Sequence, residues 1–153
     1  MKLKYIEEKN TVISELTAVG VSHEQAEVVA DCFATADEYG VTSHGINMLQ
    51  AHVDKVKRGG YNLSASLVIV RETAAFAVVD GDNGFGPVSA TYCMKMAVER
   101  AKEVGVFQVF SKNNNTVGPA FYYPLKAAEE GCIGILFSNS PAQMAPFGGK
   151  EKL

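Results

Sequence analysis

Residues 75–110 read AFAVVDGDNGFGPVSATYCMKMAVERAKEVGVFQVF and carry the pattern that decides the fold. The apolar run 75–79 is rich in residues that favour strands, and the run 106–110 has the same character. Between them, apolar residues recur at helical spacing from Pro87 to about Val104. Proline suits the first turn of a helix, because the amide that it lacks has no intrahelical partner there. The stretch predicts a strand, a helix and a buried strand, which is the repeating unit of an α/β fold.

The same alternation continues on both sides of this unit. Upstream, residues 67–70 form another short β-rich run. Downstream, a polar loop over 111–115 precedes a predicted helix over 117–130, and residues 132–137 are predicted to form a further strand. With three helices at the N-terminus, the predicted order is ααα-ββ-α-β-α-β.

The N-terminal helices are predicted from their caps. The first covers about residues 4–18. The second begins at Ser22, because Ser22–Gln25 has the S-x-x-Q form of a capping box, and Gly40 ends it. Thr42 or Ser43 then caps a third helix. Its buried face is formed by Ile46, Leu49, Val53 and Val56.

Composition excludes several classes of function. The 153 residues carry a net charge of −3, so the chain has no basic excess to neutralise nucleic-acid phosphates. No apolar run reaches about 18 residues, so no transmembrane helix is predicted. Charges interrupt the first residues before a signal peptide could form. Three widely spaced cysteines indicate reduced thiols in a cytoplasmic protein and no metal site.

Several short motifs occur in a fixed order along the chain. They are Asp37-Glu38-Tyr39-Gly40-Val41-Thr42-Ser43-His44-Gly45, the glycine-rich stretch 79–86, Gly131–Ile135, Asn139-Ser140 and Pro146-Phe147-Gly148-Gly149. In this order they resemble the landmarks of the type-2 malate/L-lactate dehydrogenase family, which includes ureidoglycolate, sulfolactate and 2,3-diketogulonate dehydrogenases. The resemblance covers essentially the whole chain.

The resemblance implies a fold and an activity. The fold would be α/β but not Rossmann, with a helical segment over 1–60 carrying the Ser-His-Gly motif. An α/β portion over 61–153 would be incomplete at its C-terminus, because family members continue beyond this point. The activity would be hydride transfer between NAD or NADP and a 2-hydroxy or 2-oxo acid, in a cytoplasmic homodimer that binds neither nucleic acid nor membranes.

His44 is the predicted catalytic residue. Hydride transfer requires a group that takes up or releases the hydroxyl proton, and histidine is suited to this by its pKa. If Ser43 caps the third helix, His44 is its first residue, and the helix dipole favours the neutral imidazole. Gly45 would leave the adjacent backbone open to a ligand. The alternative is a surface histidine at a helix start, and His23 and His52 are both interpreted as structural.

The resemblance assigns further site residues by position. Ser43, Met48 and Thr116 would contact the substrate, although many family members carry arginine at the Met48 position and histidine at the Thr116 position. For Thr116 the alternative is that residues 113–115 are only a polar turn. Ser140 and the Gly148-Gly149 loop would contact the cofactor.

Two interpretations stay open at this level. The glycine-rich loop 81–86 resembles a phosphate-binding turn, but a tight strand-to-helix turn is favoured, because Asp80 and Asp82 would repel phosphate. The chain is either part of a dehydrogenase or a truncated, degenerate family member that serves as an interaction or dimerisation module. In both cases apolar surface is expected to be exposed, and the isolated chain is expected to oligomerise.

Overall fold

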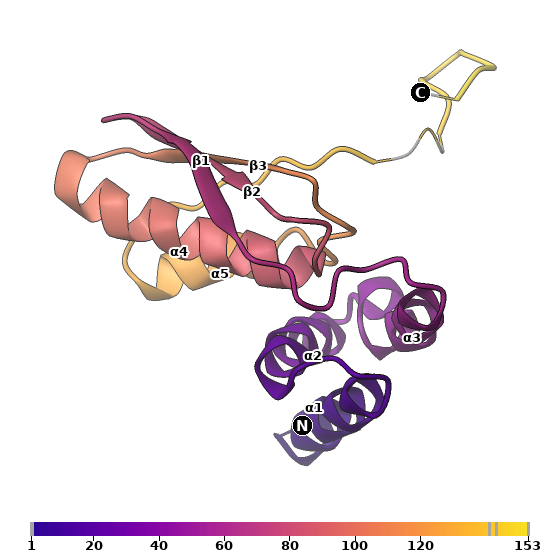
Figure 1. Cartoon of the computed structure of the whole chain (residues 1–153). Helices are drawn as coiled ribbons and strands as arrows, with labels where there is room; N and C mark the ends of the chain where they lie inside the picture. The colour runs from indigo at the N-terminus through magenta and orange to yellow at the C-terminus, as the bar shows by residue number, and fades with distance from the viewer. Residues whose placement is uncertain (1, 141, 143, 153) are drawn as a thin grey trace.

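Three helices pack together at the N-terminus. A computed structural model describes residues 2–140, 142 and 144–152, with side chains from residue 4 onward. Helices α1 (Lys2–Ala18), α2 (His23–Glu38) and α3 (Leu49–Lys57) form one group, separate from the sheet in Figure 1. Two 3₁₀ turns, η1 (Thr42–His44) and η2 (Ile46–Met48), connect α2 to α3. We call residues 2–57 the helical unit.

The core of the helical unit is formed by the apolar faces that the helical spacing predicted. Its buried members include Val12, Leu16, Val29, Phe33, Leu49 and Val53. Ser22 caps α2 by accepting the Gln25 amide at 3.3 Å, but Gln25 does not complete the capping box. Its side-chain amide donates to the Leu63 carbonyl at 3.4 Å, and its Oε1 has no partner. Helix α2 ends at Glu38, and Gly40 follows with φ +78°, as predicted for a helix stop.

The α/β portion contains a small mixed sheet. Its strands β1 (Val68–Glu72), β2 (Phe76–Asp80) and β3 (Gln108–Lys112) lie in the order β1-β2-β3. Strands β1 and β2 are antiparallel and joined by a short turn, and α4 (Gly86–Val104) connects β2 to the parallel strand β3. Helices α4 and α5 (Tyr122–Glu129) cover one face of this sheet (Figure 1). The predicted class, α/β with a helical N-terminal segment, is confirmed.

Burial in the sheet is one-sided. Ala77 and Val79 of β2 are fully buried. Val78 and Phe110 are register partners on the opposite face, and Phe110 is exposed there. The strand predicted near Phe110 is present as β3, but it is not buried, because among the described residues it pairs with β2 alone and its outer face is uncovered.

Two further predictions differ from the structure. The helix predicted over 117–130 is shortened to α5, because Gly118 has φ +77° and precedes Pro119, which disfavours helical backbone. Residues 132–137, predicted as a strand, form no ladder with any described residue. Exposure nevertheless alternates along them, with Ile133, Ile135 and Phe137 outward. Inward, a side chain on Gly134 would meet Pro124 and Ala127 of α5.

Candidate active site and its surroundings

The Ser-His-Gly turn lies between α2 and α3. His44 closes the 3₁₀ turn η1, and Gly45, with φ −94° and ψ −144°, interrupts the helical backbone before η2. Helix α3 begins only at Leu49. The prediction that His44 is the first residue of an α-helix is therefore wrong, and the helix-dipole argument does not apply to it.

The His44 side chain is exposed and oriented by its neighbour. The Ser43 hydroxyl lies 2.9 Å from Nδ1 of His44. The other ring nitrogen, Nε2, has no hydrogen-bond partner among the described residues. The geometry leaves one ring nitrogen for orientation and the other for an incoming group.

The sequence predicts that the backbone at Gly45 is open to a ligand. The structure shows that this prediction is wrong. Gly45 is buried, and a Cβ at this position would overlap the Asp37 carboxylate. The same carboxylate accepts the Ile46 amide at 2.7 Å. Asp37 thus connects α2 to η2. Its place in the motif, eight residues before Gly45, was the available signal.

The remaining predicted substrate residues have different surroundings. Met48 is half-buried and packs against the core of the helical unit. Thr116 is exposed, in a loop that Asn115 holds through bonds to the Asn83 and Gly84 carbonyls. Lys55 of α3 donates to Asn115, which ties this loop to the helical unit. Among the described residues, Thr116 makes no hydrogen bond with the Ser-His-Gly turn.

The glycine-rich loop 81–86 packs against the chain itself. Side chains at Gly81 and Gly86 would overlap Asn114 and the Thr116 carbonyl, respectively. Asp80 accepts Lys112 at 2.8 Å, and this bond is the main reason that its pKa falls to about 2. These contacts favour the tight-turn interpretation over a phosphate cradle.

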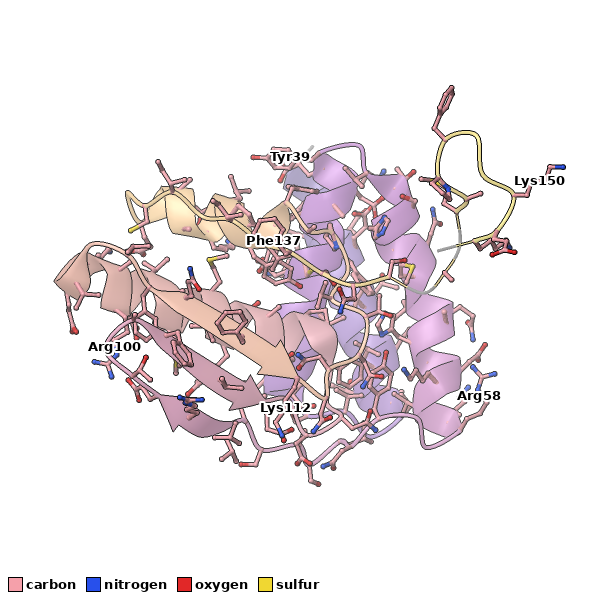
Figure 2. The ribbon with its side chains drawn as sticks, turned by 90° about the horizontal axis from the view of Figure 1, so that it is seen from above. Tyr39, Arg58, Arg100, Lys112, Phe137 and Lys150 are labelled. Atoms are coloured by element: carbon pink, nitrogen blue, oxygen red, sulfur yellow. The ribbon has the colours of Figure 1, made fainter. Side chains whose placement is uncertain are left out.

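The predicted cofactor residues lie on an exposed segment. Ser140, Gly148 and Gly149 are all exposed, and Gly149 closes a turn on the Pro146 carbonyl at 2.8 Å. The segment projects beyond the body of the molecule, with Lys150 near its end (Figures 1 and 2). The described residues alone do not enclose a dinucleotide, so we derive no step through the cofactor.

His52 is a core residue. Its side chain is buried between the rings of Phe33, Tyr61 and Phe85, and Nδ1 lies 2.7 Å from the Tyr61 hydroxyl. Burial, followed by the charge of Lys55, lowers its pKa to about 4. His23 is exposed and lies 3.7 Å from Glu27. Both environments agree with the structural interpretation of these two histidines.

Sequence reasoning missed a carboxylate that connects three helices. Asp31 of α2 accepts Tyr5 at 2.6 Å and Lys9 at 2.8 Å from α1, and Tyr122 at 2.7 Å from α5. Burial would raise its pKa, but these bonds outweigh burial and lower the pKa to about 2. These side chains are far apart in the sequence and meet only in the folded protein, so no short sequence pattern predicts the contact.

The surface pockets do not contain the predicted site. A pocket of about 290 Å³ lies between α4 and α5, with Met94, Val98 and Tyr123 in its wall. A second lies between α1 and α3 and reaches Ile46 and Asn47. Neither is lined by His44, Thr116 or Ser140. Within the described ranges no helix is long and apolar enough to span a membrane, and no cluster of metal-ligating side chains is found.

The fold resembles one class of solved structures, the dehydrogenases, among them structures named as malate and sulfolactate dehydrogenases. The structure of malate dehydrogenase from Pyrococcus horikoshii OT3 superposes with a TM-score of 0.81 at 40% identity, over 83% of this chain and 36% of that one. The sequence profile described as malate/L-lactate dehydrogenase matches residues 3–153, and the chain belongs to this family.

Curated relatives agree with this assignment. The malate dehydrogenase of Pyrococcus horikoshii is 43% identical over 142 residues, which are 93% of this chain and 39% of the relative. The L-sulfolactate dehydrogenase of Methanocaldococcus jannaschii is 42% identical over 153 residues, which are 100% of this chain and 44% of the relative. The chain thus spans less than half the length of these relatives.

Proposed function

We propose that this chain provides the proton-transfer residue of an NAD(P)-dependent oxidoreductase. The reaction is hydride transfer between nicotinamide and a 2-hydroxy or 2-oxo acid of the malate, lactate or ureidoglycolate type. The observation that carries the proposal is the exposed His44 side chain, whose Nδ1 lies 2.9 Å from the Ser43 hydroxyl while Nε2 has no hydrogen-bond partner among the described residues. The named relatives are dehydrogenases, so the comparisons give no support to the non-catalytic alternative.

The proton chemistry assigned to His44 follows from this geometry. A base at Nε2 needs its proton on Nδ1, and the Ser43 oxygen then accepts that Nδ1–H. The Ser43 hydroxyl can accept from Nδ1 as well as donate to it, so the contact is compatible with the tautomer whose Nε2 lone pair takes a proton from a substrate hydroxyl. In the reverse direction, the protonated ring returns the proton to a carbonyl oxygen.

The other assignments belong to the same proposal. Met48 and Thr116 line the substrate side, with Ser43. Ser140, Gly148 and Gly149 contribute part of the site for NAD or NADP, together with residues beyond those described. The working protein is a cytoplasmic homodimer, and segments 1–60 and 61–153 are its helical and α/β portions.

Substitution of His44 tests the proposal, with His23 as a matched exposed control. We expect turnover of 2-oxo acids with NADH or NADPH, measured by loss of cofactor absorbance. His44→Gln should lower kcat by about 10²–10⁴-fold, as for loss of a general acid–base group. His23→Gln should match the wild type. Dinucleotide affinity, measured by fluorescence titration, should change little in either variant. Turnover that persists in His44→Gln would remove His44 from the mechanism, and absence of dinucleotide binding by the wild type would contradict the proposed function.

A further inference from the structure

The carboxylate of Asp37 contacts the backbone of the Ser-His-Gly turn. Asp37, in the last turn of α2, reaches forward and accepts the Ile46 amide at 2.7 Å. Gly45 is buried directly against this carboxylate, so a side chain there would overlap it. Two backbone positions immediately after His44 are thereby fixed to α2.

We propose that Asp37 is a positioning residue for His44. It sets the backbone of the turn that presents the imidazole and does not itself touch the substrate. The inference rests on the proposed function for its kinetic part, whereas its structural part can be measured without any substrate.

The other bonds of the turn are local. Residues 42–48 form two separate 3₁₀ turns in place of one continuous helix, in which the Gly45 amide donates to the Thr42 carbonyl at 3.4 Å and the Gly45 carbonyl accepts the Met48 amide at 2.9 Å. Among the described residues, the turn's other side-chain bonds, from Asn47 to the Thr42 carbonyl at 3.0 Å and between Ser43 and His44, are also internal to it. The Asp37 bond instead connects the turn to α2, whose inner face is buried in the core.

The bond is also well placed energetically. Asp37 is half-buried, and a charged acceptor makes a stronger hydrogen bond to a backbone amide than a neutral one does. Loss of the carboxylate would leave the Ile46 amide without its acceptor and open space beside Gly45. A displacement of about 1 Å at a catalytic group is enough to cost about 10²-fold in rate.

The experiment compares Asp37→Ala and Asp37→Asn, with Glu38→Gln as the neighbouring exposed carboxylate. Asparagine keeps an oxygen that accepts the Ile46 amide, whereas alanine removes it. Hydrogen exchange of the Ile46 amide should accelerate in Asp37→Ala and stay near the wild type in Asp37→Asn and Glu38→Gln. Equal exchange in all four proteins would overturn the inference, whatever their activity.

Histidine ring resonances separate a local effect from a loss of fold. Asp37→Ala should shift or broaden the His44 signals, assigned by their absence in His44→Gln. The signals of His52, which is buried in the core, and of His23, which lies on the far end of α2, should stay in place. Movement of all three would show a general structural change and would contradict a positioning role.

The kinetic part adds a readout that a purely structural role would not move. Asp37→Ala should lower kcat by about 10²-fold at unchanged dinucleotide affinity, and Asp37→Asn should recover most of this loss. Because Gly45 touches the carboxylate, Gly45→Ala should also lower kcat. In the double variant that carries both Gly45→Ala and Asp37→Ala, the fold-decrease in kcat should be smaller than the product of the two single fold-decreases. A fold-decrease in kcat equal to that product would show that the two positions act separately. If His44→Gln were active, the proposed function would fail, while the exchange result would still decide the role of Asp37.

Discussion

The helical unit buries a core of large apolar side chains, whereas the α/β portion leaves several of its own exposed. In the helical unit, Phe33 is fully buried, and the other apolar residues at helical spacing surround it. On the α/β portion, the extended segment that follows α5 exposes Ile133, Ile135 and Phe137, which we call the apolar strip. Figure 2 labels Phe137 on this segment. Helices satisfy their own backbone and need only a packed face, whereas an extended segment also needs a neighbouring strand. The helical unit therefore buries its apolar face, whereas the extended segment after α5 leaves its apolar side chains exposed.

The largest expected effect is the difference in stability loss between a phenylalanine substitution in the helical unit and one in the apolar strip. Phe33→Ala should destabilise the protein by about 3–5 kcal/mol, because it empties a fully buried site. Phe137→Ala removes the same ring from a residue that is 92% exposed, and should change stability by no more than about 0.5 kcal/mol. Denaturant unfolding measures both values. Similar losses in the two variants would contradict the contrast drawn between the regions.

A second effect concerns His52, at the contact between the helical unit and the α/β portion. Burial lowers the pKa of His52 to about 4 in the folded protein, against 6.5 for a free histidine side chain, so the folded state resists protonation. The stabilisation is fully present above about pH 6.5 and is lost as pH falls toward 4. At about 1.4 kcal/mol per pKa unit, the loss is about 3 kcal/mol.

The measurement is the unfolding free energy as a function of pH in three proteins. His52→Gln should lack this part of the pH dependence, while His23→Gln should keep it, because His23 is exposed. The difference between wild type and His52→Gln isolates the contribution of His52 from those of the carboxylates. Parallel curves for the two proteins would show that His52 is protonated equally well in the folded and unfolded states.

Local patterns predicted the parts of the fold that depend on local physics. The cap at Ser22, the stop at Gly40 and the helix from the glycine-rich turn to Val104 follow from backbone groups and apolar spacing within a few residues. The family assignment followed from the order of short motifs. The placement of His44 failed, because a helix start was inferred from Ser43 without allowance for the break at Gly45.

The missed features depend on contacts between distant segments. Asp31 meets Tyr122 only after α2 and α5 are assembled, and the strand expected at 132–137 requires a partner that no apolar run specifies. Asp37 stood within the recognised motif, but its role depends on the turn that returns the chain to the end of α2. Sequence periodicity describes one segment at a time and carries no information on such pairings.

Substitutions in the apolar strip should have the smallest effect on stability, and they test whether this exposed surface causes self-association. We expect the isolated chain to self-associate, because Ile133 and Phe137 are 96% and 92% exposed and Phe110 of β3 is exposed on the uncovered sheet face. The backbone of 132–137 forms no ladder among the described residues, so a second copy can pair with it as well as cover its side chains.

Replacing Ile133 and Phe137 by serine should lower the mass measured by light scattering toward the 16.4 kDa of one chain, with a stability change of no more than about 0.5 kcal/mol. Ile6→Ser removes an exposed apolar residue from α1 and should leave self-association unchanged, because that side chain lies on the helical unit and outside the apolar strip. If Ile6→Ser disperses the assembly instead, the helical unit carries the contact. A wild-type chain that stays monomeric at high concentration would mean that the strip is tolerated in water, and its exposure would no longer distinguish the two regions.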